Sequence, residues 1–426
     1  MSGATNLPTQ VDVVVVGAGL AGMAAARVAQ ASGRSVVVLE AADGVGGRVR
    51  SDLVDGFRLD RGFQVLLTAY PEIARQLDVK ALDLRPFLPG SLVWTGQRPY
   101  AVGDPLRRLS LALPSAVAPI GSVADKLKLA RLLSRVRSAS PRDLLRGPDV
   151  STIESLRSAG FGDRIIERFF RPLLGGIQLD PELGGSARMA EVVLHCLATG
   201  DAAVPAAGMQ AISDQMAAHL GDGVVHLCTE VASVEPGRVH TSDGRSVEAR
   251  AVVVATEGPA ASRLLRGHRV ADRGSLGVGC VWFEAPAPPV AQRLIVLDGT
   301  RSGPALNVAV MSTVAPEYVT ADAPVGRSLV AAACPGIDLA AGDDLADLVR
   351  RQLRGWWGPM VDQWRVLRVD RIAHGQPSAM PPFAPKRSQS LGEGLWVCGD
   401  HRDTPSIQGA MFSGRRCGES VVGALG

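Results

Sequence analysis

The apolar pattern at the start of the chain predicts a strand, a turn, a helix and a second strand. Residues 11–16 (VDVVVV) form a short β-branched run, which is typical of a strand buried on both faces. The turn GAGLAG leads into the alanine-rich MAAARVAQAS, which contains no helix breaker. Gly33 and the strand-like SVVVLE follow. Together these segments predict a β-turn-α-β unit.

Two similar apolar strands lie far downstream, at residues 249–256 and 395–400, and each runs into a loop as the first strand does. We therefore expect one α/β domain with a Rossmann-like, doubly wound parallel sheet that is discontinuous in sequence. Its predicted segments are residues 1–65, 205–262 and 385–426.

The two long insertions between these segments predict a second domain of α+β type. Residues 66–204 have mostly helical periodicity. Residues 263–384 contain strand-like runs and a helix near LADLVRRQL. We expect the two insertions to form one substrate-binding domain.

One helix of the first insertion, residues 124–137, is amphipathic. Its apolar positions Leu129, Leu132, Leu133 and Val136 lie opposite basic positions that include Arg131 and Arg135. Packing of the leucines into a core is the more common outcome for such a helix. The alternative is an interfacial helix that lets the protein touch a membrane surface.

Composition narrows the function classes. The chain has 426 residues, 46% of them hydrophobic, and a formal net charge of +3. This near-neutral balance argues against a nucleic-acid partner. The six cysteines form no C-x-x-C pair and no apolar run is long enough to span a bilayer, so we expect reduced thiols, no metal site and a cytoplasmic protein.

The first glycine turn carries the chemistry. Gly17, Gly19 and Gly22 form G-x-G-x-x-G between a strand and a helix, where the backbone allows a pyrophosphate to reach the helix N-terminus. Glu40 closes the second strand, where a carboxylate can accept hydrogen bonds from the hydroxyls of an adenosine ribose. NAD and FAD fit these residues equally.

The continuation distinguishes the two cofactors. Gly46 and Gly47 allow a second close backbone approach, and Arg48 can neutralise a diphosphate. With V-V-G-A-G-L-A-G, E-A-x-x-x-x-G-G-R, F-x-x-D-x-G-x-Q, V-P-A-A-G-M and the C-terminal G-D-x-x-x-x-x-S-I-Q-G-A-M, the sequence resembles the flavin-containing amine oxidase superfamily. That superfamily includes phytoene desaturases and protoporphyrinogen oxidases.

The resemblance implies noncovalent FAD, because Cys398 is displaced from the position used for covalent attachment in amine oxidases. It implies a role for Val231 against adenine, for Gly399 and Asp400 at the diphosphate and ribityl chain, and for a helix that starts at Ser406 beside the pyrimidine ring. The full set of expected cofactor-binding residues is Gly17, Gly19, Leu20, Ala21, Gly22, Glu40, Ala41, Gly47, Arg48, Gly62, Phe63, Gln64, Val231, Gly399, Asp400, Ser406, Ile407 and Gln408.

The sequence also departs from the amine oxidase pattern. Those enzymes usually keep a lysine near flavin N5, and the best-matching position here is Val278. Few tyrosines are available for an aromatic cage, although Trp364 or Trp396 could form one wall. His374 is a candidate acid or base near the flavin, with a structural histidine as the alternative.

We expect a desaturase-like dehydrogenation, in which an apolar small molecule passes a hydride to flavin N5. The alternatives are an amine oxidase with an atypical site and a redox-silent FAD-binding scaffold. No second G-x-G-x-x-G lies between a strand and a helix, so oxygen, a quinone or a redox partner is the expected electron acceptor.

Overall fold

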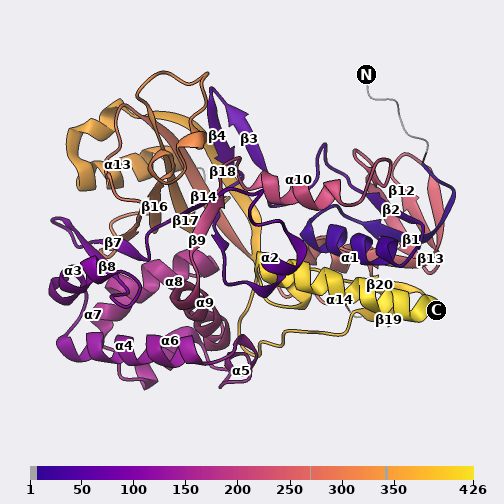
Figure 1. Cartoon of the computed structure of the whole chain (residues 1–426), viewed down its shortest axis with the longest axis horizontal. Helices are drawn as coiled ribbons and strands as arrows, with labels where there is room; N and C mark the ends of the chain where they lie inside the picture. The colour runs from indigo at the N-terminus through magenta and orange to yellow at the C-terminus, as the bar shows by residue number, and fades with distance from the viewer. Residues whose placement is uncertain (1–6, 269, 341–343) are drawn as a thin grey trace.

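The chain forms two lobes, each built on its own sheet (Figure 1). The computed structural model describes residues 7–268, 270–340 and 344–426. The first lobe contains an eight-stranded sheet and the second a seven-stranded sheet. The chain passes between the lobes several times, so each lobe is assembled from segments that lie far apart in the sequence.

Five strands of the first lobe are parallel. They lie in the order β10 (Val225–His226), β2 (Val36–Leu39), β1 (Gln10–Val16), β13 (Ser246–Val254) and β20 (Leu395–Val397). Valines pair with valines in the middle of this sheet, as Val14 does with Val252. The predicted α/β fold with a parallel sheet is confirmed, and so is its assembly from distant strands.

The edge of β13 that faces away from β1 also carries antiparallel strands. They are β12 (Arg238–Thr241) and β11 (Val231–Glu235), while β19 (Ser390–Gly392) pairs with β20. Val239 and Val247 of this part share an apolar cluster with Val14 and Val252. One face of the parallel strands is therefore covered partly by other strands.

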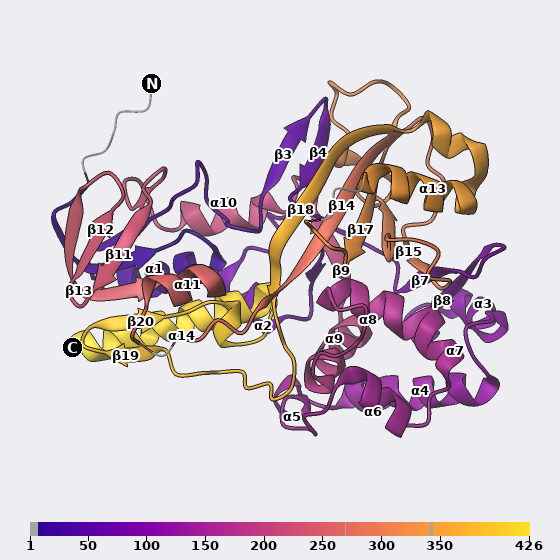
Figure 2. The ribbon, with the colours of Figure 1, turned by 180° about the vertical axis from the view of Figure 1, so that it is seen from behind.

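The other face of the sheet is covered by two helices from opposite ends of the chain, α1 (Leu20–Ala31) and α14 (Ile407–Leu425) (Figure 2). A Cβ on Gly414 would lie 2.0 Å from the carbonyl oxygen of Ala21, and a Cβ on Gly418 would lie 2.7 Å from that of Ala25. Because the two glycines are one turn apart, the backbones of the helices touch along a common line.

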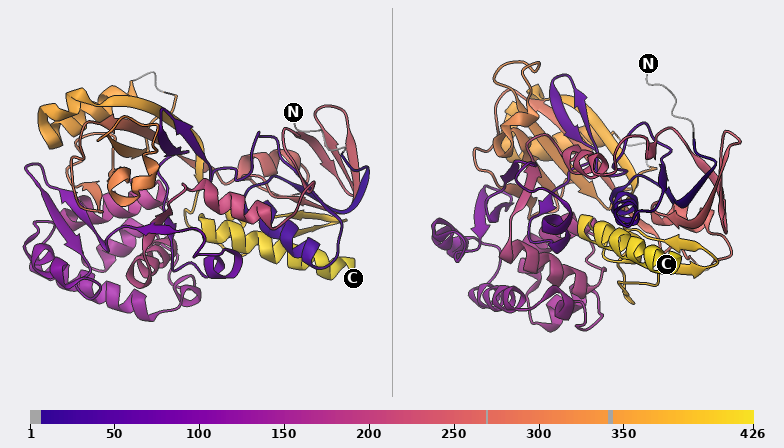
Figure 3. Two further views of the ribbon diagram at one scale, coloured as in Figure 1. Left: turned by 45° about the horizontal axis from the view of Figure 1, so that its top comes forward. Right: turned by 45° about the vertical axis from the view of Figure 1, so that its right-hand side comes forward.

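The second lobe contains a mixed sheet. Its order is β18 (Arg365–Pro377), β14 (Ser275–Ala285), β17 (Ser328–Pro335), β16 (Asn307–Val310), β15 (Ile295–Asp298), β7 (Gly90–Trp94) and β8 (Pro99–Gly103). All neighbours are antiparallel except β15 and β7. Helix α13 (Leu345–Trp357) shares a buried cluster with this sheet (Figure 3). The predicted α+β character of the insertions is confirmed.

Most of the remaining helices and strands are short. The helices are α2 (Pro71–Gln76), α3 (Ala112–Val117), α4 (Val123–Ser138), α5 (Pro141–Leu144), α6 (Thr152–Ser158), α7 (Asp163–Ile165), a π-helical turn (Ile166–Phe170), α8 (Arg171–Gln178), α9 (Ala187–Thr199), α10 (Gln210–Ala218), α11 (Gly258–Leu264) and α12 (Met311–Val314). The strands are β3 (Ser51–Val54), β4 (Phe57–Asp60), β5 (Leu66–Leu67), β6 (Leu84–Pro86) and β9 (Ala202–Pro205).

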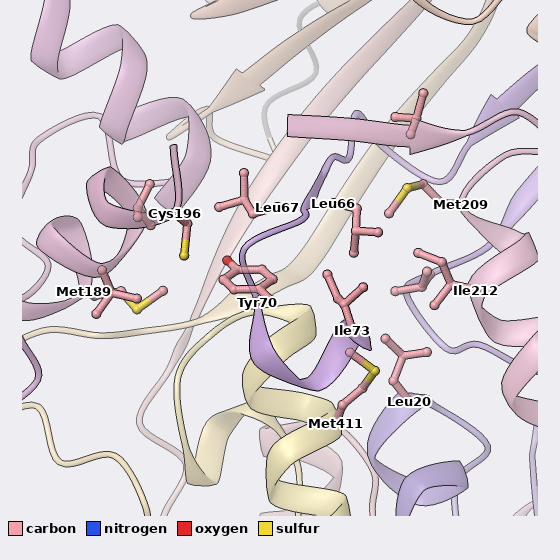
Figure 4. Packing of buried hydrophobic residues seen from close by; sticks show 14 of the residues in the cluster. Leu20, Leu66, Leu67, Tyr70, Ile73, Met189, Cys196, Met209, Ile212 and Met411 are labelled. Atoms are coloured by element: carbon pink, nitrogen blue, oxygen red, sulfur yellow. The ribbon is translucent and has the colours of Figure 1, made fainter. Parts of the chain in front are cut away.

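The core continues across the junction of the lobes. Leu20 of α1, Ile73 of α2 and Met411 of α14 belong to the same buried cluster as Met189 and Cys196 of α9 (Figure 4). Burial of this apolar surface stabilises the joined lobes more than either lobe alone.

The β3–β4 hairpin binds the lobes together through a buried carboxylate. Asp60 accepts hydrogen bonds from the Ser51 hydroxyl (2.6 Å), the Tyr318 hydroxyl (2.8 Å) and the Met209 amide (3.0 Å). Burial raises the pKa of Asp60. All strands of the first sheet lie within the expected ranges 1–65, 205–262 and 385–426. The β3–β4 hairpin also lies in the first of these ranges but contacts the other lobe. The domain boundaries therefore stay a proposal.

The helix expected at residues 124–137 is α4, and its apolar face packs inward. Val136 is buried and Leu129, Leu132 and Leu133 lie against the core. Arg135 pairs with Glu191 of α9, with Nη2 and Oε1 2.6 Å apart. Core packing of this face is confirmed, and contact of the protein with a membrane stays a proposal.

The contact between α1 and α14 leads to a prediction, for which α14 itself offers a control position. Gly414→Ala should destabilise the protein by about 1–3 kcal/mol, because the new methyl group meets the Ala21 carbonyl. Gly423→Ala should stabilise it by about 0.5–1 kcal/mol, because Gly423 has open space around its Cβ position. Thermal unfolding of the two variants should therefore shift in opposite directions. An equal rise for both would contradict the close approach of the helices.

Candidate functional site

The glycine turn after β1 places the start of α1 next to open space. Gly17 has φ of 104°, and a Cβ on Gly22 would lie 1.9 Å from the Gly17 carbonyl oxygen. Gly19 precedes α1, and nothing lies within 4 Å of its Cβ position. Leu20 and Ala21 begin the helix and are buried. The first N–H groups of α1 are not capped by a side chain, and a helix N-terminus of this kind suits an anion such as a diphosphate.

Glu40 lies just after β2 and binds the same turn. Its carboxylate accepts hydrogen bonds from the amides of Ala18 (2.7 Å) and Ala42 (2.9 Å). Ala41, between them in the second loop, is exposed. The Thr229 amide donates to the Glu40 carbonyl (2.8 Å), which brings the residues before Val231 to this loop. Val231 itself is half-buried at the start of β11.

The second glycine pair lies directly against the first turn. Gly46 forms a parallel bridge with Gly19, and a Cβ on Gly47 would lie 3.6 Å from the Gly19 Cα. Gly47 has φ of 58°, which favours glycine. The two loops therefore form one continuous backbone surface.

Arg48 connects this surface to both ends of the chain. Its Nη2 lies 2.8 Å from Oδ2 of Asp400, and its Nη1 donates to the Gly375 carbonyl (2.9 Å) at the end of β18. Asp400 is buried in the turn after β20, where Gly399 has φ of 142°. An arginine and a carboxylate from distant segments thus meet beside the glycine loops.

The loop at residues 62–64 supports Arg48. The Gln64 side-chain amide donates to the carbonyls of Arg48 and Arg61, each at 2.8 Å. The Gly62 amide donates to Asp370 of β18 (3.3 Å). The Phe63 ring packs edge-on against Phe87. These contacts place the loop between the first lobe and β18.

The start of α14 completes the arrangement. The Ser406 hydroxyl caps the helix by accepting from the Gly409 amide (3.0 Å), and Ile407 is half-buried. The Gln408 side chain turns towards α2, where it accepts from the Glu72 amide (2.9 Å). The sequence indicated the position of Gln408 but not this use of its side chain.

A polar pocket lies between Arg48, Asp400 and the ends of β14 and β18. His374, Gln376, Arg273 and Arg387 also line it, with Glu257 and Gly258 from the loop after β13. Sequence reasoning missed Glu257, Arg273 and Arg387, although Glu257 follows a strand already assigned to the nucleotide-binding sheet. We add them to the candidate site because they face the same space.

The electrostatics of this pocket suit an anionic group. Burial, with the charges of Arg273 and Arg402, lowers the pKa of Arg387 to about 10. Burial also lowers the pKa of His401 to about 4, so its ring is neutral at pH 7. Among the described residues, the His401 ring nitrogens and His374 Nδ1 are buried without a hydrogen-bond partner. Unpaired ring nitrogens beside several arginines fit a cofactor that carries a diphosphate.

The position expected for the amine oxidase lysine lies in the same region. A Cβ on Gly375 would lie 3.2 Å from Val278 Cγ1, so this valine faces the end of β18. Trp364 packs with Phe283 in a buried cluster, and Trp396 donates to the Ser420 hydroxyl. Both tryptophans serve the core and do not form a cage wall.

Comparison with known proteins decides the family. Residues 20–422 match the family described as flavin containing amine oxidoreductase. The chain belongs to this family. It is an FAD-dependent oxidoreductase, and the predicted cofactor and enzyme class are confirmed. The alternative that the protein is a redox-silent FAD-binding scaffold is therefore excluded.

Individual relatives have different substrates in their names. The chain is 30% identical over 276 residues to putrescine oxidase of Kocuria rosea, covering 57% of this chain and 56% of that protein. It is 29% identical over 171 residues to coproporphyrinogen III oxidase of Propionibacterium freudenreichii, covering 39% and 31%. These alignments span about half or less of the curated relatives.

Structural similarity extends over nearly the whole chain. Cyclohexylamine oxidase from Brevibacterium oxydans superposes with a TM-score of 0.71 at 17% identity, covering 97% of this chain and 99% of that one. At this identity the similarity establishes the fold alone. The substrate therefore has to be argued from the site.

The contacts of Glu40 lead to a prediction about cofactor affinity. Glu40→Gln should weaken FAD binding about tenfold or more, because an amide replaces one of two acceptor oxygens that hold the loops. Glu230→Gln, a matched change at an exposed position, should leave affinity unchanged. FAD content after purification and titration of the apoprotein measure both. Native affinity in Glu40→Gln would remove Glu40 from the proposed site.

Proposed function

We propose that this enzyme dehydrogenates an apolar small molecule. The observation that carries the proposal is Val278, where a lysine would be expected in an amine oxidase. Around the neighbouring Gly375, a Cβ would meet the side chains of Leu179 and Val278, and Gly62 lies against Ile372. This apolar surface adjoins the polar pocket, so a hydrocarbon group and an anionic cofactor each find suitable surroundings.

FAD supplies a hydride acceptor at N5 when it is bound. We propose that the turn of Gly17, Gly19 and Gly22 binds its diphosphate with Arg48, and that Glu40 binds the adenosine ribose. Val231 would pack on adenine. Gly399 and Asp400 would hold the ribityl chain, and Ser406, Ile407 and Gln408 would place the start of α14 beside the pyrimidine ring.

Binding of the cofactor without a covalent bond is part of the proposal. The thiol of Cys398 is buried and lies 4.0 Å from the carbonyl oxygen of Ala21, so it faces α1. A thiol in this position is directed into the core of the first lobe. This orientation supports noncovalent FAD.

We assign His374 as a candidate acid or base. It lines the pocket with Arg48 and Asp400, and its Nδ1 is among the buried atoms without a partner in the described part of the chain. Such a nitrogen can donate or accept a proton from a bound group. The other side chains of the site would orient the substrate and exclude water.

A second candidate function is oxidation of an amine at an atypical site. The similarity to putrescine oxidase favours it. The valine at position 278 and the core placement of Trp364 and Trp396 count against it. Dehydrogenation of an apolar molecule therefore remains the preferred proposal.

For the second half-reaction we propose oxygen, a quinone or a redox partner as electron acceptor. The six cysteines are free thiols, which supports a cytoplasmic location. In the part of the chain that the structure describes, no helix has the length and apolarity needed to cross a membrane. Peripheral contact with a membrane stays a proposal and involves a different surface from the one first expected.

The missing lysine predicts a negative result with amines. Primary amines and polyamines should reduce the flavin slowly or not at all, because no lysine side chain lies at position 278 to assist them. Anaerobic mixing followed at the flavin absorption band measures this, with dithionite as the control that the bound flavin is reducible. Fast bleaching by a common amine would make the second candidate the better one.

The assignment of His374 is tested with an apolar substrate that reduces the flavin. His374→Gln should slow reduction by about a hundredfold, within the usual contribution of an acid or base, and should remove its pH dependence. His219→Gln, at an exposed position, should do neither. Unchanged FAD content in both variants shows that binding is intact. If the flavin of the His374→Gln variant is reduced at the native rate, this histidine has only a structural role.

A further inference from the structure

Six large apolar side chains lie exposed in one short stretch of the second lobe. They are between 57% and 83% exposed, whereas side chains of this kind are mostly buried elsewhere in the molecule. We call them the 106–127 patch. Its members are Leu106, Leu109, Leu113, Val117, Val123 and Leu127.

Helical spacing places these residues on common faces. Leu109, Leu113 and Val117 are four residues apart along the 3-10 turn Leu109–Leu111 and helix α3 that follows it. Val123 and Leu127 are four apart on α4. Lys126 donates to the carbonyl of Ala116, which ties the end of α3 to the start of α4. The two apolar faces therefore belong to one surface.

The inner sides of the same elements are anchored in the core. Leu111, Ile120 and Val136 are buried, and the Ser122 and Asp125 side chains form a capping box at the start of α4. The exposed residues thus project from a fixed base. A contiguous exposed apolar patch of this kind typically marks an interaction surface.

Most of the charged side chains around the patch that face solvent are basic. Asp125 is buried in its cap, and Asp104 pairs with Arg137. Arg108 and Arg131, by contrast, are exposed. Burial and the nearby charge of Arg164 lower the pKa of Lys126, which places a further arginine close to the patch.

Position in the molecule also matters. Helix α3 and the start of α4 lie at the end of the second lobe away from α14 and the first sheet (Figures 1 and 3). A partner bound there would leave the pocket around Arg48 uncovered. The patch is therefore separate from the candidate flavin site.

We propose that the 106–127 patch docks the protein on a membrane surface that contains anionic lipid. The leucines and valines enter the interfacial region, and Arg108 and Arg131 contact the lipid head groups. A second copy of the chain fits less well, because a two-fold interface would bring the same cations of both copies together. The inference does not depend on which molecule the flavin oxidises.

Flotation of the full-length holoprotein with vesicles tests this surface. The native chain should float with vesicles of phosphatidylcholine and phosphatidylglycerol at low salt, and much less with phosphatidylcholine alone. The double variant Leu109→Ser, Leu113→Ser should lower the bound fraction at least about tenfold, because two apolar anchors are lost. Arg108→Glu with Arg131→Glu should remove the preference for the anionic vesicles.

A matched control uses exposed apolar residues outside the patch. Leu53→Ser with Val325→Ser changes two side chains that are also exposed, and it should leave flotation unchanged. Flavin absorption and thermal unfolding verify that each variant is folded. Because flotation and substrate reduction are separate measurements, failure of one proposal leaves the other standing.

Two results would overturn the inference. One is a native chain that stays at the bottom of the gradient at low salt. The other is a patch variant that floats like the native chain. If light scattering instead finds a dimer that the leucine substitutions convert to a monomer, and no vesicles bind, the patch is an interface between two copies.

Discussion

The direct backbone contact between α1 and α14 is the constraint on which the candidate site depends. Glycines at positions 414 and 418 allow the C-terminal helix to lie against the carbonyls of Ala21 and Ala25. Even a Cβ at position 414 would lie 2.0 Å from the Ala21 carbonyl oxygen, so a larger residue would force the helices apart. The loop of Gly399 and Asp400 precedes α14, so its position relative to the first glycine turn follows from this contact.

Arg48 links the loop of Gly399 and Asp400 to the second lobe. It contacts Asp400 from the C-terminal segment and the Gly375 carbonyl from β18, while Gln64 holds its backbone. The desolvation cost of this half-buried guanidinium is offset by the carboxylate and by these oriented acceptors. The site is thus a junction where segments from all parts of the chain satisfy one another's polar groups.

Local patterns were sufficient to predict part of this arrangement. Strands rich in valine, the glycine turn and Glu40 are encoded within short stretches, and each lies where the pattern indicated. The side chain of Gln408 could not be placed in the same way, because its partner Glu72 comes from a distant helix. Arg273 and Arg387 share a pocket only after β14 and the C-terminal segment have come together.

Helix α4 shows a second reason why the sequence predicted only part of the structure. Periodicity identified the apolar face of Leu129, Leu132 and Leu133, and that face is covered by the core. Val123 and Leu127 at its start are equally apolar but remain exposed. Amphipathicity reveals which residues share a side of a helix, whereas the surrounding fold decides what covers each side.

The long pairing of β14 with β18 has a mechanical consequence. The two strands are hydrogen-bonded from Ser275 and Pro377 at the pocket to Glu284 and Arg365 near the β3–β4 hairpin. Arg365 and Arg368 bind Asp55 and Asp52 of that hairpin region. Opening the lobes as a hinge would have to break these ion pairs between β18 and the hairpin region. Motions of loops and side chains around the pocket leave these contacts intact, which favours them as the route by which small molecules exchange.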